Sequence, residues 1–132
     1  MKFGTIRQTI IIDAQPFEVY EAYADPEKQT TFTGDEAKGR PRVGGRFTAG
    51  GDYIFGKFVD LTKGEKIVQS WTTTEWPEGY PPSRLELRFK SKGKKTELTM
   101  IHSKVPAADV EKYAEGWQDF YWQPLKKYFE KS

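Results

Sequence analysis

The sequence predicts a single α+β domain in which an antiparallel sheet is covered by one long C-terminal helix. Three observations lead to this prediction. Short segments alternate apolar and polar residues, turn signals separate these segments, and apolar residues from about 107 to 129 recur at helical spacing. Short strands joined by hairpins form antiparallel sheets, and a helix with one apolar side must bury that side against a partner.

The first strand is expected over residues 3–12, because Ile6, Ile10 and Ile12 fall on one face and polar residues fall on the other. Two short helices should follow. Pro16 suits the first turn of a helix, and Asp25-Pro26 ends that helix and opens a second one, which should end near residues 33–34.

The central part of the chain reads as consecutive strands with hairpin or loop connections. Paired glycines at 44–45 and 50–51 mark turns or bulges. Together with the first strand, this region should supply a curved sheet of about six or seven strands. The clearest strand segments are 53–61, 66–73, 84–89 and 97–102.

The C-terminal helix is expected to begin after Pro106 and to contain a bend at Pro124, since proline removes a hydrogen bond and clashes with the preceding turn. Its apolar stripe includes Tyr113, Trp117 and Tyr121. A curved sheet cannot touch a straight helix along its whole length, so a space between them is expected.

Composition limits the function classes. The chain has 132 residues, which suits one domain, and a net charge of +2, which is too balanced for a dedicated nucleic-acid-binding protein. It contains no cysteine and one histidine, so a metal site is not expected, and no cofactor motif is present. Residues 1–7 show no signal or membrane segment, which predicts a cytoplasmic protein without a membrane partner.

A candidate cavity follows from the strand and helix phases. Inward positions of the strands and the facing side of the helix are expected to line it, with an amide or imidazole as its polar element. The alternative is that these side chains only pack in the core. The candidate lining residues are Gln69, Trp71, Leu85, Leu87, Met100, His102, Trp117 and Tyr121.

Two other features have competing interpretations. His102 could act as a general acid or base inside the cavity, or its nitrogens could simply be satisfied by neighbouring hydrogen bonds. Four lysines at 90, 92, 94 and 95 form a basic hairpin that is either a solvated tip or a contact for an acidic partner.

An ordered set of short motifs resembles one known family over nearly the whole chain. The motifs resemble the activator of heat shock protein 90 ATPase family, in particular its C-terminal domain, within the START-like (SRPBCC) superfamily. Phe32 stands before Thr33-Gly34 where the family usually has tryptophan. The matching segments are residues 14–20 (AQPFEVY), 25–27 (DPE), 43–47 (VGGRF), 67–71 (IVQSW), 98–102 (LTMIH) and 121–125 (YWQPL), with Tyr113 and Gly116-Trp117 between the last two.

The resemblance implies a single START-like domain over residues 1–132, with a helix-grip fold and an apolar cavity under the last helix. It implies a non-enzymatic domain that holds a small hydrophobic ligand. One alternative is a chaperone-associated protein that regulates an ATPase by docking. Another is an enzyme similar to the polyketide cyclases of the wider superfamily, which would need positioned acid and base groups in the cavity.

Overall fold

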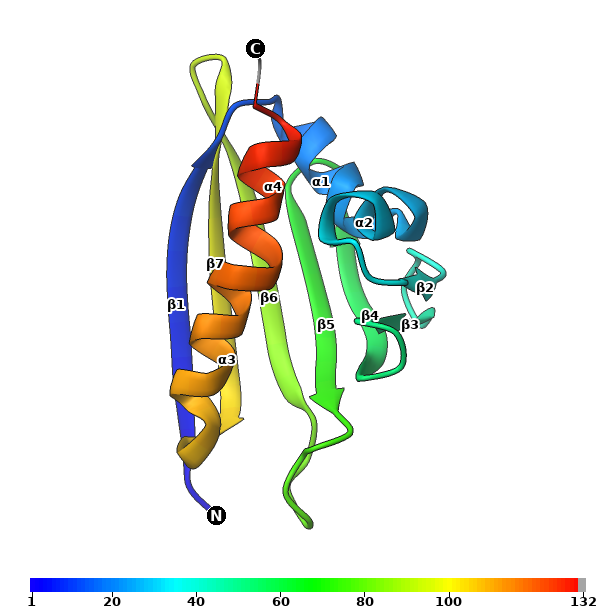
Figure 1. Cartoon of the computed structure of the whole chain (residues 1–132), viewed down its shortest axis with the longest axis vertical. Helices are drawn as coiled ribbons and strands as arrows, with labels where there is room; N and C mark the ends of the chain where they lie inside the picture. The colour runs from blue at the N-terminus through cyan, green and yellow to red at the C-terminus, as the bar shows by residue number, and fades with distance from the viewer. Residues whose placement is uncertain (131–132) are drawn as a thin grey trace.

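The computed structural model describes residues 1–130 and shows a seven-stranded sheet with all helices on one face (Figure 1). The strand order is β1-β7-β6-β5-β4-β3-β2, and every neighbouring pair is antiparallel. The strands are β1 (Phe3–Ile12), β2 (Lys38–Gly39), β3 (Arg46–Ala49), β4 (Ile54–Thr62), β5 (Lys66–Thr73), β6 (Ser83–Lys92) and β7 (Lys95–Pro106).

The predicted α+β helix-grip architecture is confirmed. The first strand pairs with the last one, so Ile6 lies opposite His102 and Ile10 lies opposite Leu98. Strands β6 and β7 extend beyond the segments expected from alternation, because the polar residues of their hairpin continue the backbone pairing. Strand pairing can continue where the apolar–polar alternation stops, because the hydrogen bonds between strands use backbone groups and do not depend on the side chains.

Two short helices, α1 (Pro16–Ala24) and α2 (Pro26–Thr33), follow β1 as predicted. Asp25 caps α2, because its carboxylate accepts a hydrogen bond of 2.9 Å from the backbone N–H of Glu27. Gly34 ends α2 with a φ of 81°, a left-handed conformation that glycine adopts without steric cost.

The C-terminal helical run consists of a 3-10 turn η1 (Ala107–Asp109), α3 (Val110–Trp117), a π-helical turn η2 (Gln118–Trp122) and α4 (Gln123–Tyr128). Where a bend was expected at Pro124, the helix has a π-helical turn directly before the proline. The N–H of Gln123 bonds to the carbonyl of Gln118, five residues earlier. The wider turn gives the proline ring the space that an α-helical turn would deny it.

The core lies between the sheet and the helices and contains the inward residues of β1, β5, β6 and β7. On the opposite face of the sheet, Glu86 is only 6% exposed because Arg84 and Arg88 flank and pair with it. Burial alone would raise the pKa of Glu86, but the two guanidinium groups lower it. Among residues 1–130, no helix combines the length and the apolar character needed to cross a membrane.

Candidate functional site

A pocket of about 390 Å³ lies between the C-terminal helical run and the part of the sheet formed by β4 and β5. Side chains far apart in the sequence form its walls: the end of α2, the turn before β4, one residue of β5, and helical residues 112–121. Half of the lining residues are aromatic. They are Thr33, Asp35, Gly50, Tyr53, Ile54, Trp71, Lys112, Tyr113, Gly116, Trp117, Phe120 and Tyr121.

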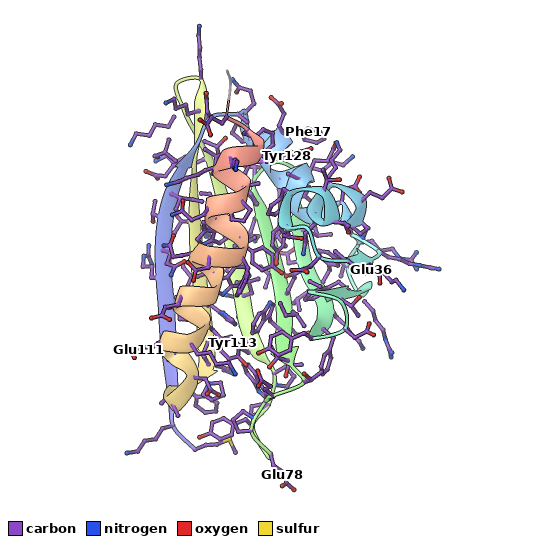
Figure 2. The ribbon with its side chains drawn as sticks, viewed as in Figure 1. Phe17, Glu36, Glu78, Glu111, Tyr113 and Tyr128 are labelled. Carbon is purple, nitrogen blue, oxygen red and sulfur yellow. The ribbon has the colours of Figure 1, made fainter. Side chains whose placement is uncertain are left out.

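The inner wall of the pocket is a set of packed aromatic rings. Trp71 lies 5.2 Å from Tyr113 and 5.7 Å from Trp117 between ring centroids, and Trp117 lies 4.7 Å from Tyr121. These four rings are buried, whereas Phe120 at the rim is 63% exposed. Figure 2 shows Tyr113 and Glu111 on opposite sides of α3, with Tyr113 on the side of the pocket. The pocket is therefore apolar inside and open at one side.

A chain of hydrogen bonds behind the rings uses the polar atoms of the inner wall. Trp117 donates its indole N–H to His102 Nδ1 at 3.1 Å, which makes Nδ1 an acceptor and places the proton on Nε2. His102 Nε2 then donates to Ser83 Oγ at 2.8 Å, and Ser83 donates to the carbonyl of Trp71 at 2.6 Å. Each donor in this series of hydrogen bonds has one acceptor, so His102 is held as the neutral Nε2–H tautomer.

Burial lowers the pKa of His102 to about 3, because the charged imidazolium would lose its solvation and gain no acidic partner. Both ring nitrogens are already bonded to protein groups, and the side chain is fully buried. Of the two interpretations of His102, the structure favours the satisfied histidine, and a general acid or base of ordinary pKa is not available at this position.

The rim of the pocket carries an ion pair between α3 and the residues after β5. Glu75 accepts hydrogen bonds from Lys112 Nζ at 2.7 Å and from Tyr53 Oη at 2.6 Å. The bond from Lys112, and then that from Tyr53, lowers the pKa of Glu75, and the same bond raises the pKa of Lys112. Lys112 also lies 5.3 Å from the ring centroid of Tyr113. This pair connects the helix to the sheet at the entrance.

Three of the eight predicted lining residues do line the pocket: Trp71, Trp117 and Tyr121. The other five do not. Leu85, Leu87 and Met100 are 0% exposed in the closed core, and His102 lies behind Trp117. Gln69 is also buried away from the pocket, where its side-chain carbonyl accepts a 2.9 Å hydrogen bond from the hydroxyl of Tyr23.

The position of the helix explains why some of the predicted residues line the pocket and others lie in the closed core. Gln8 of β1 donates to the carbonyl of Ala114 at 3.0 Å and accepts from the indole N–H of Trp122 at 2.8 Å. These bonds hold the helical run over the β1 side of the sheet, where it closes the space above β6 and β7. The pocket lies on the opposite side, towards β4, where Tyr53 and Ile54 belong to its lining.

Several pocket residues were not predicted from the sequence. Tyr53 lies in the turn before β4 and Ile54 is the first residue of β4, so both come from a part of the sheet far from the helix in sequence. Tyr113 is in phase with Trp117, and Gly116 leaves space because it has no side chain; both signals are visible in the sequence. Within the part of the chain that the structure describes, no cluster of three or more histidine, aspartate or glutamate side chains is arranged to hold a metal ion.

The curved antiparallel sheet, the helix that it grips and the pocket between them define a helix-grip domain of the START-like class. A family model described as "Activator of Hsp90 ATPase homolog 1-like protein" matches residues 13–130. The chain therefore belongs to this family, as its motifs indicated.

Known relatives agree with this assignment. The chain is 31% identical over 125 residues to the human "Activator of 90 kDa heat shock protein ATPase homolog 1", covering 95% of this chain and 36% of the human protein. It thus spans about a third of that relative's length. A solved Plasmodium falciparum structure described as an HSP90 activator is 26% identical, has a TM-score of 0.78 and covers 87% of both chains. The solution structure of CalU16 from Micromonospora echinospora has a TM-score of 0.80 at 26% identity, covering 96% of this chain and 65% of CalU16.

Proposed function

We propose that this domain binds a small apolar ligand that contains a flat ring, in the aromatic pocket beneath the C-terminal helix. The observation that carries the proposal is the inner wall, which combines Trp71, Tyr113, Trp117 and Tyr121 around a volume of about 390 Å³. This volume lies within the range of about 300 to 1,000 Å³ that small-molecule sites occupy.

The hydrogen bonding of the wall defines what it can recognise. Tyr113 shares a 2.7 Å hydrogen bond with Thr73, and Trp117 donates to His102. These polar atoms are already paired with protein groups, so the rings offer the ligand mainly carbon surface. Binding should then depend on apolar burial and ring stacking rather than on a specific polar contact.

The proposal is one of binding without catalysis. His102 is buried and bonded at both nitrogens, and burial raises the pKa of Tyr121, so neither is poised to exchange protons near neutral pH. At the entrance, Glu75 is paired with Lys112 and accepts a hydrogen bond from Tyr53, which leaves Asp35 as the carboxylate of the lining. A cyclase-type reaction would need an acid and a base positioned together, and no second free group accompanies Asp35 among the described lining residues.

The experiment is a titration with an alkylbenzene series while the tryptophan emission is followed. Affinity should rise by about 0.8 kcal/mol for each added methylene that is buried. The variant that blocks the pocket is Gly116→Leu. Gly116 lines the pocket, and there is space for a side chain, because only the ring of Phe120 lies within 4 Å of a Cβ at this position, at 3.9 Å. The leucine side chain should occupy the pocket and abolish binding, while the thermal midpoint should not fall, since leucine favours a helix more than glycine does.

Two results would contradict the proposal. One is an emission spectrum that no member of the series changes. The other is a Gly116→Leu variant that folds and binds the series as well as the original chain, which would place the ligand elsewhere.

A second candidate function rests on the relatives. We propose, as an alternative, that the domain docks on a chaperone of the Hsp90 type and changes its ATPase rate, because its curated relatives are named as activators of that ATPase. Adding the purified domain to the Hsp90 ATPase assay tests this directly. An unchanged ATPase rate at saturating domain would reject the alternative and leave the ligand-binding proposal intact.

A further inference from the structure

A second hollow, of about 450 Å³, lies on the edge of the sheet farthest from β1 and shares no residue with the aromatic pocket. It is formed by the turn between β2 and β3. Three arginines line it, together with the glycines of the same turn: Gly39, Arg40, Arg42, Gly44, Gly45 and Arg46. We refer to residues 38–46 as the arginine loop.

Positive charge is concentrated in the arginine loop. Its nine residues include four basic ones, Lys38, Arg40, Arg42 and Arg46, and no acidic one. The whole chain has 21 basic and 19 acidic residues, so the remaining residues carry 17 basic and 19 acidic ones, a net charge of −2. The arginine loop is therefore one of two strongly basic segments, the other being the lysine hairpin of residues 90–95.

The three arginines are not used by the fold. Among residues 1–130, no carboxylate lies within salt-bridge distance of Arg40, Arg42 or Arg46, and their side chains form no hydrogen bond with a described residue. Elsewhere on the molecule, Arg84 and Arg88 both pair with Glu86. The arginines of the loop thus keep all of their guanidinium donors for a group outside the chain.

The backbone that carries these arginines is rigid. The N–H of Gly44 bonds to the carbonyl of Phe58, and the N–H of Phe58 bonds to the carbonyl of Gly45, both at 2.8 Å. The backbone N–H of Arg40 donates to the carbonyl of Arg46 at 3.0 Å. Gly45 cannot be replaced without a shift of the backbone, because a Cβ there would overlap the carbonyl oxygen of Arg40. The loop therefore holds the backbone positions of its arginines fixed, so that binding has to order only their side chains.

One apolar side chain accompanies the charges. Val43, between Arg42 and Gly44, is 64% exposed at the tip of the loop. Guanidinium groups bind carboxylates in a bidentate manner, and an exposed valine adds an apolar contact. No aromatic side chain lines the hollow, although stacking on aromatic rings is the usual means of holding single-stranded nucleic acid.

We propose that the arginine loop is a docking site for an acidic segment of a partner protein, one in which carboxylates flank an apolar residue. The three guanidinium groups bind the carboxylates, and Val43 contacts the apolar residue. The site works independently of the aromatic pocket and does not depend on whether the pocket holds a ligand.

The test measures binding of a short fluorescein-labelled peptide of alternating glutamate and leucine by fluorescence anisotropy. The variant Arg40→Gln/Arg42→Gln/Arg46→Gln should lose about tenfold or more in affinity, because each exposed charge pair contributes a factor of a few. Val43→Ser should weaken binding severalfold. Both variants should keep the original thermal midpoint, since the substituted side chains make no contact that the fold uses.

The matched control removes the same charge from the other basic loop, as Lys90→Gln/Lys94→Gln/Lys95→Gln. This variant should bind the peptide within about twofold of the original chain, because screening limits the reach of distant charges at physiological salt. An equal loss in both triple variants would overturn the proposal in favour of a general charge effect. So would a failure of the original chain to bind the peptide.

The identity of the partner class is tested by replacement of the probe. A thymidine oligonucleotide and phosphatidylserine vesicles should each compete weakly with the peptide, and the Val43→Ser variant should not change their binding. If either competitor binds the arginine loop more tightly than the peptide does, the site is one for phosphate groups and the assignment to an acidic protein segment is wrong.

Discussion

Acidification from pH 7 to pH 5 should lower the free energy of unfolding by about 2 kcal/mol through His102 alone. His102 is the only histidine of the chain, and burial lowers its pKa from 6.5 to about 3. Between these two values the unfolded chain binds one proton more than the folded chain does. The contribution of the neutral His102 to the free energy of unfolding is therefore fully present above about pH 6.5. It is lost progressively as the pH falls towards 3, at up to about 1.4 kcal/mol per pH unit.

The measurement is urea unfolding at several pH values between 7 and 5, followed by tryptophan emission. The control is His102→Gln, whose amide offers a carbonyl to the indole of Trp117 and an N–H to Ser83 but does not titrate. This variant should be less stable at pH 7, by about 1 to 3 kcal/mol, because the amide does not reproduce the shape of the ring or the geometry of both bonds. Its stability should change little over the same pH range.

Two outcomes would refute the reasoning. If the original chain is equally stable at pH 7 and pH 5, the imidazole is not held neutral by burial. If His102→Gln keeps the same pH dependence, another group causes it. The slope of the free energy of unfolding against urea concentration should be the same at every pH, which shows that the same two states are being compared.

Three further perturbations test other parts of the structure. Trp117→Ala should reduce stability by about 3 to 5 kcal/mol, since it removes a buried ring and leaves His102 Nδ1 without a donor, and an unchanged denaturant midpoint would show that the ring is not packed inward. Gly56→Ala should cost about 1 to 3 kcal/mol, because a Cβ there would overlap the carbonyl oxygen of Ser70 on the neighbouring strand, and a midpoint equal to that of the original chain would contradict this close approach. Glu75→Gln should hardly affect stability, because the ion pair is exposed, but it should free Lys112 and strengthen the binding of pocket ligands that carry a carboxylate; unchanged affinity for these ligands would show that Glu75 does not compete for Lys112.

The fold could be predicted because its signals are local. Alternation over residues 3–12 and the stripe through Tyr113, Trp117 and Tyr121 each specify one element and its buried side. The proline after Asp25 and the glycine at 34 mark the boundaries of α2 by their own backbone preferences. These properties depend on neighbours a few positions away, so the sequence carries them directly.

The pocket could be predicted only in part because its position depends on long-range contacts. Strand phase identifies which residues face inward, and in that sense Leu85, Leu87 and Met100 were assigned correctly to the covered face. It does not say which inward residues the helix covers. That is decided by where the helix crosses the sheet, and Tyr53 and Ile54, from the turn before β4 and its first residue, join the pocket only in the folded protein.

Gln8 is the side chain that connects β1 to the helix by hydrogen bonds. It lies in phase with Ile6 and Ile10 on the inward face of β1, and a polar side chain at such a position requires a partner. The sequence does not name that partner. The structure shows two, since Gln8 donates to Ala114 and accepts from Trp122, so one side chain ties α3 and η2 to β1.

Replacing this side chain with one of similar size and no polar atoms should therefore weaken the attachment of the helix. Gln8→Leu leaves the indole N–H of Trp122 without an acceptor at a position that is 1% exposed, and this should cost about 1 to 3 kcal/mol. The expected signature is faster hydrogen exchange of the Trp122 indole, measured by nuclear magnetic resonance. Thr9→Ala, on the exposed face of the same strand, should change stability by no more than about 0.5 kcal/mol. If both variants behave alike, Gln8 does not set the position of the helix, and the pocket must owe its place to the aromatic packing around Trp117 instead.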